Sequence, residues 1–298
     1  MADSVLTLNA PAAGLRLVVC MATGVSREAG ARHALAAGSG AVLGQGLAAA
    51  LLLAAHERTR VDVQLECNGP LRGLLVDADE SGAVRGLVRA NPPAGAPQGA
   101  EPERFDARPL LASPHDERAG LISVLRAPSG PDSAHRAAFP FAGADLGAAL
   151  TLVLRGEREQ GGEMALEALV SAREPLAVVA GVIVAPLRAA DAEIARALGK
   201  PLRQGGLLAA LHGADHARAV ADRLSRAFHL GALQAVAEIQ PRFTCRCSRE
   251  RVERALRSLG APELDDMARR DGGARLTCDF CNAAYNFSAD ELLRIAQP

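Results

Sequence analysis

The sequence predicts an α+β protein, with an antiparallel-sheet core and helices, a helical linker and a small C-terminal domain. Three observations predict it. Short apolar runs separated by turn residues alternate with helical patterns up to about residue 186. Ala/Leu/Arg segments with helical spacing follow, and four cysteines in two close pairs stand near the end. The corresponding boundaries are 1–187 for the core, 188–240 for the linker and 241–298 for the tail.

The composition is that of a globular protein. With 298 residues, 49% of them hydrophobic, the chain is long enough to bury a sizeable core. A formal net charge of −1 gives the whole molecule no field that gathers nucleic acid or anionic lipid. The N-terminus lacks the basic start and long apolar stretch of a secretory signal. Six cysteines without such a signal fit reduced thiols, so we expect a cytoplasmic protein.

The first part of the core reads as one strand, two helices and an antiparallel meander. The predicted strand is 15–22, the helices are 27–37 and 41–56, and the meander is 61–90, whose runs are separated by Asn68-Gly69-Pro70 and Asp79-Glu80-Ser81-Gly82. The longest apolar run, 41–55, is shorter than the roughly 18 residues a bilayer crossing needs. We therefore interpret it as a buried helix and expect no membrane association.

A second hairpin, a helix and two buried strands complete the predicted core. After a Pro/Gly-rich loop at 91–100, the strands 120–127 and 134–141 are joined by a turn at 128–132. A helix follows at 145–155, and the apolar runs 164–172 and 176–186 come next. The last run is rich in β-branched residues, which is typical of a buried strand.

The linker, residues 188–240, is predicted to form several short helices broken at glycines. Their apolar faces consist mainly of Ala and Leu, so each helix is marginally stable alone and has to pack on another surface.

The tail holds a Cys-x-Cys pair and a Cys-x-x-Cys pair with 30 residues between them. Two close pairs of soft thiolate ligands are what a tetrahedral zinc ion requires, whereas four merely buried thiols seldom show this spacing. We therefore predict one Zn²⁺ per chain, bound in the reduced form by four ligands: Cys245, Cys247, Cys278 and Cys281. The aromatic content of the tail is too small to hold it folded, while zinc supplies on the order of 10–16 kcal/mol to such modules.

The spacing leaves two roles open for this zinc site, an inert structural knuckle and a redox switch. A disulfide closed within Cys-x-Cys is strained and therefore easily reduced again. Three arginines near the first pair are available to favour thiolate over thiol, namely Arg242, Arg246 and Arg249. Helix caps at Ser248 and Ser288, the second with a capping-box sequence, indicate a compact module around the site.

Two segments of the tail, FTCRCSRERVERALRSLG and LTCDFCNAAYNFSADEL, resemble the zinc domain of the heat shock protein 33 family, the redox-regulated holdase chaperones. Two further segments are similar to the core meander and the core-closing strand of that family, VDVQLECNGPLRGLLVDADESGAVRGLVRANP and LAVVAGVIVAPL.

The resemblance implies a chaperone that holds unfolding client proteins without ATP. It implies that oxidation joins Cys245 with Cys247 and Cys278 with Cys281, that zinc then leaves, and that tail and linker unfold. It also implies a homodimer on oxidative activation. With the resemblance added, we favour the redox switch.

Other candidate residues receive structural interpretations. Cys20 and Cys67 lack close cysteine neighbours and read as buried small side chains without a role. His212 and His216, with Asp215, have no obvious third ligand partner and read as a solvated face. The glycines in 38–40 and 44–46 favour close helix packing over a nucleotide loop. Since no hydrolase or metalloprotease motif is present, we expect no enzyme.

The alternative function is a nucleic-acid-binding zinc ribbon with a purely structural zinc. Between Arg242 and Arg257 there are six Arg and two Glu, a local positive excess that suits phosphates. Acidic residues balance it over the whole tail, so we expect a solvated helix face and no nucleic-acid partner.

Overall fold

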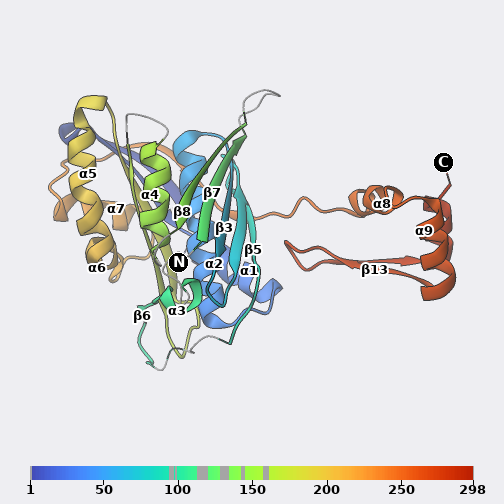
Figure 1. Cartoon of the computed structure of the whole chain (residues 1–298). Helices are drawn as coiled ribbons and strands as arrows, with labels where there is room; N and C mark the ends of the chain where they lie inside the picture. The colour runs from blue at the N-terminus through green and yellow to red at the C-terminus, as the bar shows by residue number, and fades with distance from the viewer. Residues whose placement is uncertain are drawn as a thin grey trace. The chain divides into compact units, whose positions relative to one another are not determined.

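The longest helix, α2 (Ala37–Glu57), lies between two six-stranded sheets (Figure 1). This computed structural model describes residues 2–93, 97, 99–112, 120–127, 134–141, 145–156 and 161–297. The fold is α+β, as predicted. The chain divides into two compact units, Met1–Phe243 and Thr244–Pro298.

The first sheet has the strand order β11-β1-β2-β10-β9-β6, and each neighbouring pair is antiparallel. Its strands are β1 (Ser4–Ala10), β2 (Leu15–Met21), β6 (Glu103–Arg104), β9 (Glu163–Val170), β10 (Val178–Pro186) and β11 (Gln234–Ile239). Helices cover both of its faces, which explains why the central strand β10 is apolar and buried along nearly its whole length.

The second sheet has the order β12-β5-β4-β3-β7-β8 and is antiparallel apart from the parallel pair β12–β5. Its strands are β3 (Arg60–Cys67), β4 (Gly73–Ala78), β5 (Ala83–Val88), β7 (Gly120–Ala127), β8 (His135–Phe141) and β12 (Arg242–Phe243). In β3 buried residues alternate with more exposed ones, because only one face of this sheet packs on helices. The predicted meander and second hairpin are confirmed; the turn predicted at 128–132 lies outside the described residues.

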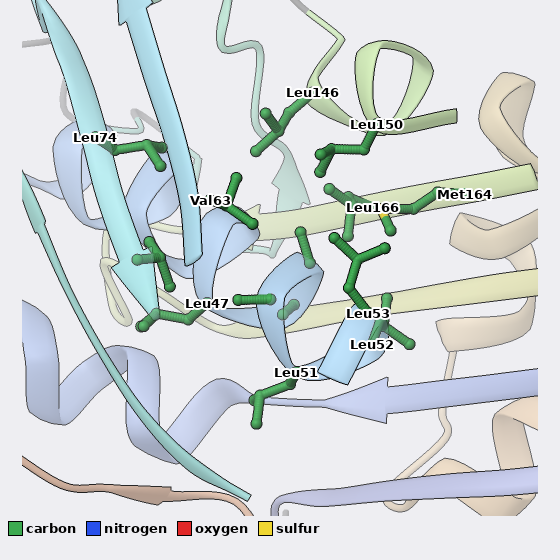
Figure 2. Packing of buried hydrophobic residues seen from close by; sticks show 14 of the residues in the cluster. Leu47, Leu51, Leu52, Leu53, Val63, Leu74, Leu146, Leu150, Met164 and Leu166 are labelled. Carbon is green, nitrogen blue, oxygen red and sulfur yellow. The ribbon is translucent and has the colours of Figure 1, made fainter. Parts of the chain in front are cut away.

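The core fills the space between the sheets around α2. Figure 2 shows Leu47 and Leu53 of α2 among side chains of both sheets, with Leu74 and Leu166 on different strands. Close packing of α2 depends on its glycines, because a Cβ at Gly44 would lie 2.8 Å from the Val179 side chain. The α1 helix (Thr23–Arg32) packs on α2, and the short α3 (Arg108–Leu111) and α4 (Leu146–Gly156) complete the layer.

The α2 helix is also long and apolar enough to cross a membrane, by length and composition alone. It extends beyond the predicted 41–55 run, so the length argument against a membrane span no longer holds. Burial replaces that argument, because 94% of its most apolar window is inside the protein. This is the expected behaviour of a central core helix.

The linker segment packs on the outer face of the first sheet. Figure 1 shows its helices grouped on one side of the first unit: α5 (Ala192–Pro201), α6 (Leu207–Leu211) and α7 (Ala217–Ala227), with the π-helical turn η3 (Leu202–Gly206) between α5 and α6. Arg203 of η3 donates to the buried carboxylate of Glu163 over 3.0 Å. The predicted short helices are therefore present, and they have the packing partner that their small apolar faces require.

The prediction of helices up to residue 240 is wrong for its last stretch. Residues Gln234–Ile239 form β11, the edge strand of the first sheet, which pairs with β1. The side chains of β11 are almost all exposed, so backbone pairing with an open sheet edge decides its conformation instead of side-chain pattern. The strand β1 was not predicted either.

The second unit contains three α-helices and a β-hairpin among its described residues. They are α8 (Arg249–Arg257), α9 (Ala261–Asp266), the π-helical turn η4 (Met267–Asp271), the hairpin strands β13 (Gly273–Thr277) and β14 (Ala284–Ser288), and α10 (Ala289–Ile295). Both predicted caps are confirmed: Ser248 accepts from the Arg251 amide, and Ser288 with Glu291 forms a capping box.

Candidate metal centre

The four cysteines of the tail come together at one point. Cys245 and Cys247 stand in the extended segment before α8, and Cys278 and Cys281 stand in the turn between β13 and β14. The structure thus joins two segments that are 30 residues apart in the sequence.

The sulfur atoms have the spacing of a tetrahedral site. All four Sγ atoms lie within 4.8 Å of one another. Two of the distances join the two pairs, 3.6 Å from Cys245 to Cys278 and 3.4 Å from Cys247 to Cys281. Four sulfurs about 2.3 Å from one zinc ion are separated by about 3.8 Å, so the arrangement fits such an ion. Within the described residues, this is the one group of His, Cys, Asp or Glu side chains that could hold a metal.

Backbone hydrogen bonds shape the turn that carries the second pair. The Asn282 amide donates to the Cys278 carbonyl over 2.8 Å, and the Cys278 amide donates to the Ala283 carbonyl over 2.9 Å. Asn282 has φ 60°, a left-handed conformation that asparagine tolerates better than most residues. This closed loop directs both sulfurs of Cys-x-x-Cys toward the first pair.

A tyrosine adds a hydrogen bond to the cluster. The hydroxyl of Tyr285 in β14 donates to Cys247 Sγ over 3.0 Å. The sequence alone assigns Tyr285 no contact with the cysteines. Its contact with the sulfur depends on the register of the hairpin, in which Tyr285 faces Leu276, so no spacing rule reveals it.

Burial and neighbouring thiols disfavour ionisation of the second cysteine pair, Cys278 and Cys281. Burial is the largest cause of the raised pKa of Cys278. Burial is also the largest cause that raises the pKa of Cys281, to about 12. The hydrogen bond to Cys247 is the largest cause that raises the pKa of Tyr285 to about 12. Thiolates at this site therefore require a cation that compensates their charge, which is the role of a bound divalent metal.

Two of the three arginines near the first pair have defined partners. The Arg249 guanidinium lies 4.2 Å over the Phe287 ring and pairs with Glu291 over 2.7 Å. Arg242 belongs to the first unit and donates to the Ser81 carbonyl over 3.2 Å. Arg249 is thus used for ring packing and ion pairing, and the expectation that arginines favour thiolates at the first pair, Cys245 and Cys247, stays a prediction.

The apolar core of the second unit is small. Among the described residues it consists of six buried side chains: Leu256, Leu264, Ala268, Phe287, Leu292 and Ile295. A unit of this size with so few buried side chains needs an additional source of stability, and a metal held by four thiolates is a common one.

The remaining candidate residues lie elsewhere. Cys20 is fully buried and Cys67 nearly so, both in the core of the first unit, as predicted. His216 caps α7, since its Nδ1 accepts from the Ala219 amide over 3.0 Å, and it joins no metal-capable group with His212 among the described residues. The glycines of 38–40 and 44–46 lie within α2 rather than in a loop.

Comparison with known proteins gives a consistent picture. A family model described as Hsp33 protein matches residues 3–288. Relatives named 33 kDa chaperonin include one from Pelobacter propionicus, 31% identical with 100% of this chain and 95% of the relative covered. Another, from Nostoc punctiforme, is 33% identical, with 99% and 96% covered.

A solved structure is similar over the same extent. The crystal structure of the 33 kDa chaperonin (heat shock protein 33 homolog) from Thermotoga maritima matches with a TM-score of 0.75. The two sequences are 22% identical, and the match covers 99% of this chain and 98% of that one. At this identity the likeness concerns the fold.

Proposed function

The chain belongs to the Hsp33 family, and we propose that it is an ATP-independent holdase chaperone activated by oxidation of its four clustered cysteines. Its relatives are named chaperonins, and the family is not an enzyme family. The observation that carries the switch is the cluster itself: four sulfurs within 4.8 Å of one another, in a unit with six buried apolar side chains.

The residues proposed to hold one zinc ion in the reduced form are Cys245, Cys247, Cys278 and Cys281. When bound, zinc supplies the positive charge that keeps these sulfurs ionised and close together. Sulfur-only ligation suits a soft or borderline metal and not calcium or magnesium.

The activating step is a two-electron oxidation of each cysteine pair. A thiolate attacks a hydroperoxide, so that an S–O bond forms, the O–O bond breaks and hydroxide or water leaves. A second thiolate then attacks the sulfenic sulfur, forming the S–S bond and releasing hydroxide. The formation of each disulfide thus transfers two electrons from a cysteine pair to one peroxide molecule.

We propose that the pairing joins Cys245 with Cys247 and Cys278 with Cys281. The folded cluster brings sulfurs of both pairs within reach. As the unit unfolds, however, a bond between sequence neighbours closes a loop of one or two residues, whereas a cross-pair bond closes a loop of 30 or more residues. Oxidised sulfurs no longer carry the charge that binds the metal, so the unit loses its main source of stability.

Unfolding is proposed to extend from the tail, 241–298, into the linker, 188–240, while the core at 1–187 stays folded. The strand β11, directly upstream of the tail, is held largely by backbone pairing and is nearly fully exposed. The linker helices bury mostly Ala and Leu. The exposed segments would bind unfolding client proteins in the cytoplasm, with a homodimer formed on activation and no membrane or nucleic acid involved.

The test follows zinc and chaperone activity in one sample. Reduced protein is treated with hydrogen peroxide at raised temperature, while a colorimetric chelator reports zinc and light scattering reports aggregation of a denatured client. We expect zinc release and suppression of aggregation to appear together and to reverse with dithiothreitol. The matched control is the double variant Cys20→Ala, Cys67→Ala, which keeps the four clustered cysteines and should respond like the wild type.

Zinc loss without holdase activity would refute the chaperone switch. If the reduced, zinc-loaded protein instead binds RNA or DNA with a steep salt dependence, the arginine-rich α8 favours the rival function, a nucleic-acid-binding ribbon with structural zinc.

A further inference from the structure

The Tyr285 hydroxyl is placed to act on one sulfur of the cluster. It donates a hydrogen bond to Cys247 Sγ over 3.0 Å, while its ring packs against the small core of the second unit. Tyr285 lies on the hairpin that carries the second cysteine pair, whereas Cys247 belongs to the first pair. The hydrogen bond therefore links the two ligand segments directly.

A donor on a thiolate changes how readily the sulfur reacts. Attack on a peroxide uses a sulfur lone pair, and a hydrogen bond to the sulfur draws charge away from it. Nucleophilicity falls as the sulfur becomes less basic. The hydrogen bond to the sulfur has to weaken as the S–O bond forms, because the sulfur then loses two electrons. A hydroxyl at this distance consequently slows oxidation of the sulfur that it contacts.

We propose that Tyr285 is a positioning residue that restrains Cys247 and so raises the amount of hydroperoxide needed to start the oxidation of the cluster. This inference rests on the proposed function, since it concerns the rate of the same switch. The oxidant, the S–O bond formed and the hydroxide released are those of the step described above.

The variant Tyr285→Phe separates the hydroxyl from the ring. It keeps the aromatic packing in the small core and removes the hydroxyl that donates to Cys247 Sγ. Ser288→Ala is the matched control: Ser288 lies on the same strand, and its side chain accepts from the Glu291 amide as the cap of α10. It measures what general weakening of the unit does to zinc retention.

Two rates are measured for each protein, zinc release by hydrogen peroxide and zinc transfer to a chelator without oxidant. Loss of a hydrogen bond worth about 0.5–1.5 kcal/mol corresponds to about a two- to tenfold faster reaction with peroxide for Tyr285→Phe. Its transfer to the chelator should be unchanged or slower, because a more basic sulfur holds the metal more firmly. Ser288→Ala should accelerate both rates together.

Equal acceleration of both rates in Tyr285→Phe would assign Tyr285 a merely structural role and overturn the inference. An unchanged peroxide rate would overturn it as well. If the wild type itself releases no zinc to peroxide, the proposed function fails and this inference falls with it. Site-resolved alkylation of the reduced, zinc-loaded protein gives a further readout: the share of early adducts on Cys247 should rise in the variant, and an unchanged share would contradict restraint of that sulfur.

Discussion

The two units of the chain are stabilised in different ways. The first buries a long apolar helix between two sheets, with leucines from α2 fully enclosed (Figure 2). Among its described residues, the second has an apolar cluster of six buried side chains and gathers four sulfurs. Burial of large apolar side chains supplies stability from the chain itself, whereas stability supplied by a ligand disappears with that ligand. A chain built this way can lose one part of its fold and keep the other.

The cysteines show the same contrast on a smaller scale. Cys20 is fully buried among apolar side chains, and burial raises the pKa of its thiol, so it is protected from oxidants by both inaccessibility and protonation. The four cysteines of the tail are only partly buried, apart from Cys281. The environment of each thiol, and not its residue type, decides whether it is a structural or a reactive group.

Removal of the metal is predicted to have the largest effect. A strong chelator under reducing conditions should unfold residues 244–298, because zinc supplies on the order of 10–16 kcal/mol to modules of this kind. Hydrogen exchange followed by mass spectrometry should show loss of protection in β13, β14 and α10, while β2 and β10 keep theirs. The apo and zinc-loaded proteins form the matched pair.

Retention of protection in β13 and β14 after complete zinc removal would mean that the six buried side chains suffice. Loss of protection in β2 and β10 would mean instead that the two units unfold together. Either result would contradict the conclusion that the two units are stabilised in different ways.

A core cavity should have a smaller effect, confined to the first unit. Leu53→Ala removes a fully buried side chain of α2 and should lower the free energy of unfolding by about 2–5 kcal/mol. Zinc retention should not change, because Leu53 belongs to the core cluster of the first unit and the four cysteines belong to the second. Leu292→Ala in α10 is the matched variant: Leu292 is equally buried in the second unit, and its loss should weaken zinc retention. Denaturant unfolding and chelator titration measure the two effects.

In both units, sequence predicts the features that depend on local signals and misses those that depend on contacts between distant segments. Turn residues such as Asn68-Gly69 and the β-branched run of β10 identify the core strands because these signals are local. The cysteine spacing identifies the metal-capable cluster for the same reason. The conformation of β11 depends on the free edge of β1, which lies more than 200 residues away in the sequence. The contact of Tyr285 with Cys247 likewise depends on hairpin register and on the path of another segment.

The stability of the first unit should depend on pH through Glu167. The side chain of Glu167 is 2% exposed, and its carboxylate pairs with Arg104. Burial is the main cause that raises the pKa of Glu167 from 4.5 to about 7. Below pH 4.5 both folded and unfolded states are protonated. Between 4.5 and 7 only the folded state keeps the proton, so this contribution to stability is lost as pH rises through about 7.

The variant Glu167→Gln has no proton to lose at this position. Its stability relative to the wild type should therefore rise between pH 4.5 and 7 by at most about 3–4 kcal/mol, and level off above pH 7. Denaturant unfolding at several pH values measures the difference. The exposed Glu66→Gln is the control, with no comparable trend expected. A flat difference for Glu167→Gln would show that Arg104 offsets the burial completely.

The smallest effect expected is the loss of a helix cap, and its consequence should differ between the units. Ser288→Ala removes the capping box of α10 and should cost about 1 kcal/mol. Because zinc binding and folding of the second unit are coupled, this loss should appear as about fivefold weaker zinc affinity, and Ser288→Asp, which can still cap, should restore it. His216→Ala removes the cap of α7 in the first unit and should leave zinc affinity unchanged. Competition titration with a chelator of known affinity measures all three variants, and equal weakening by His216→Ala would mean that the stability of the first unit is transmitted to the metal.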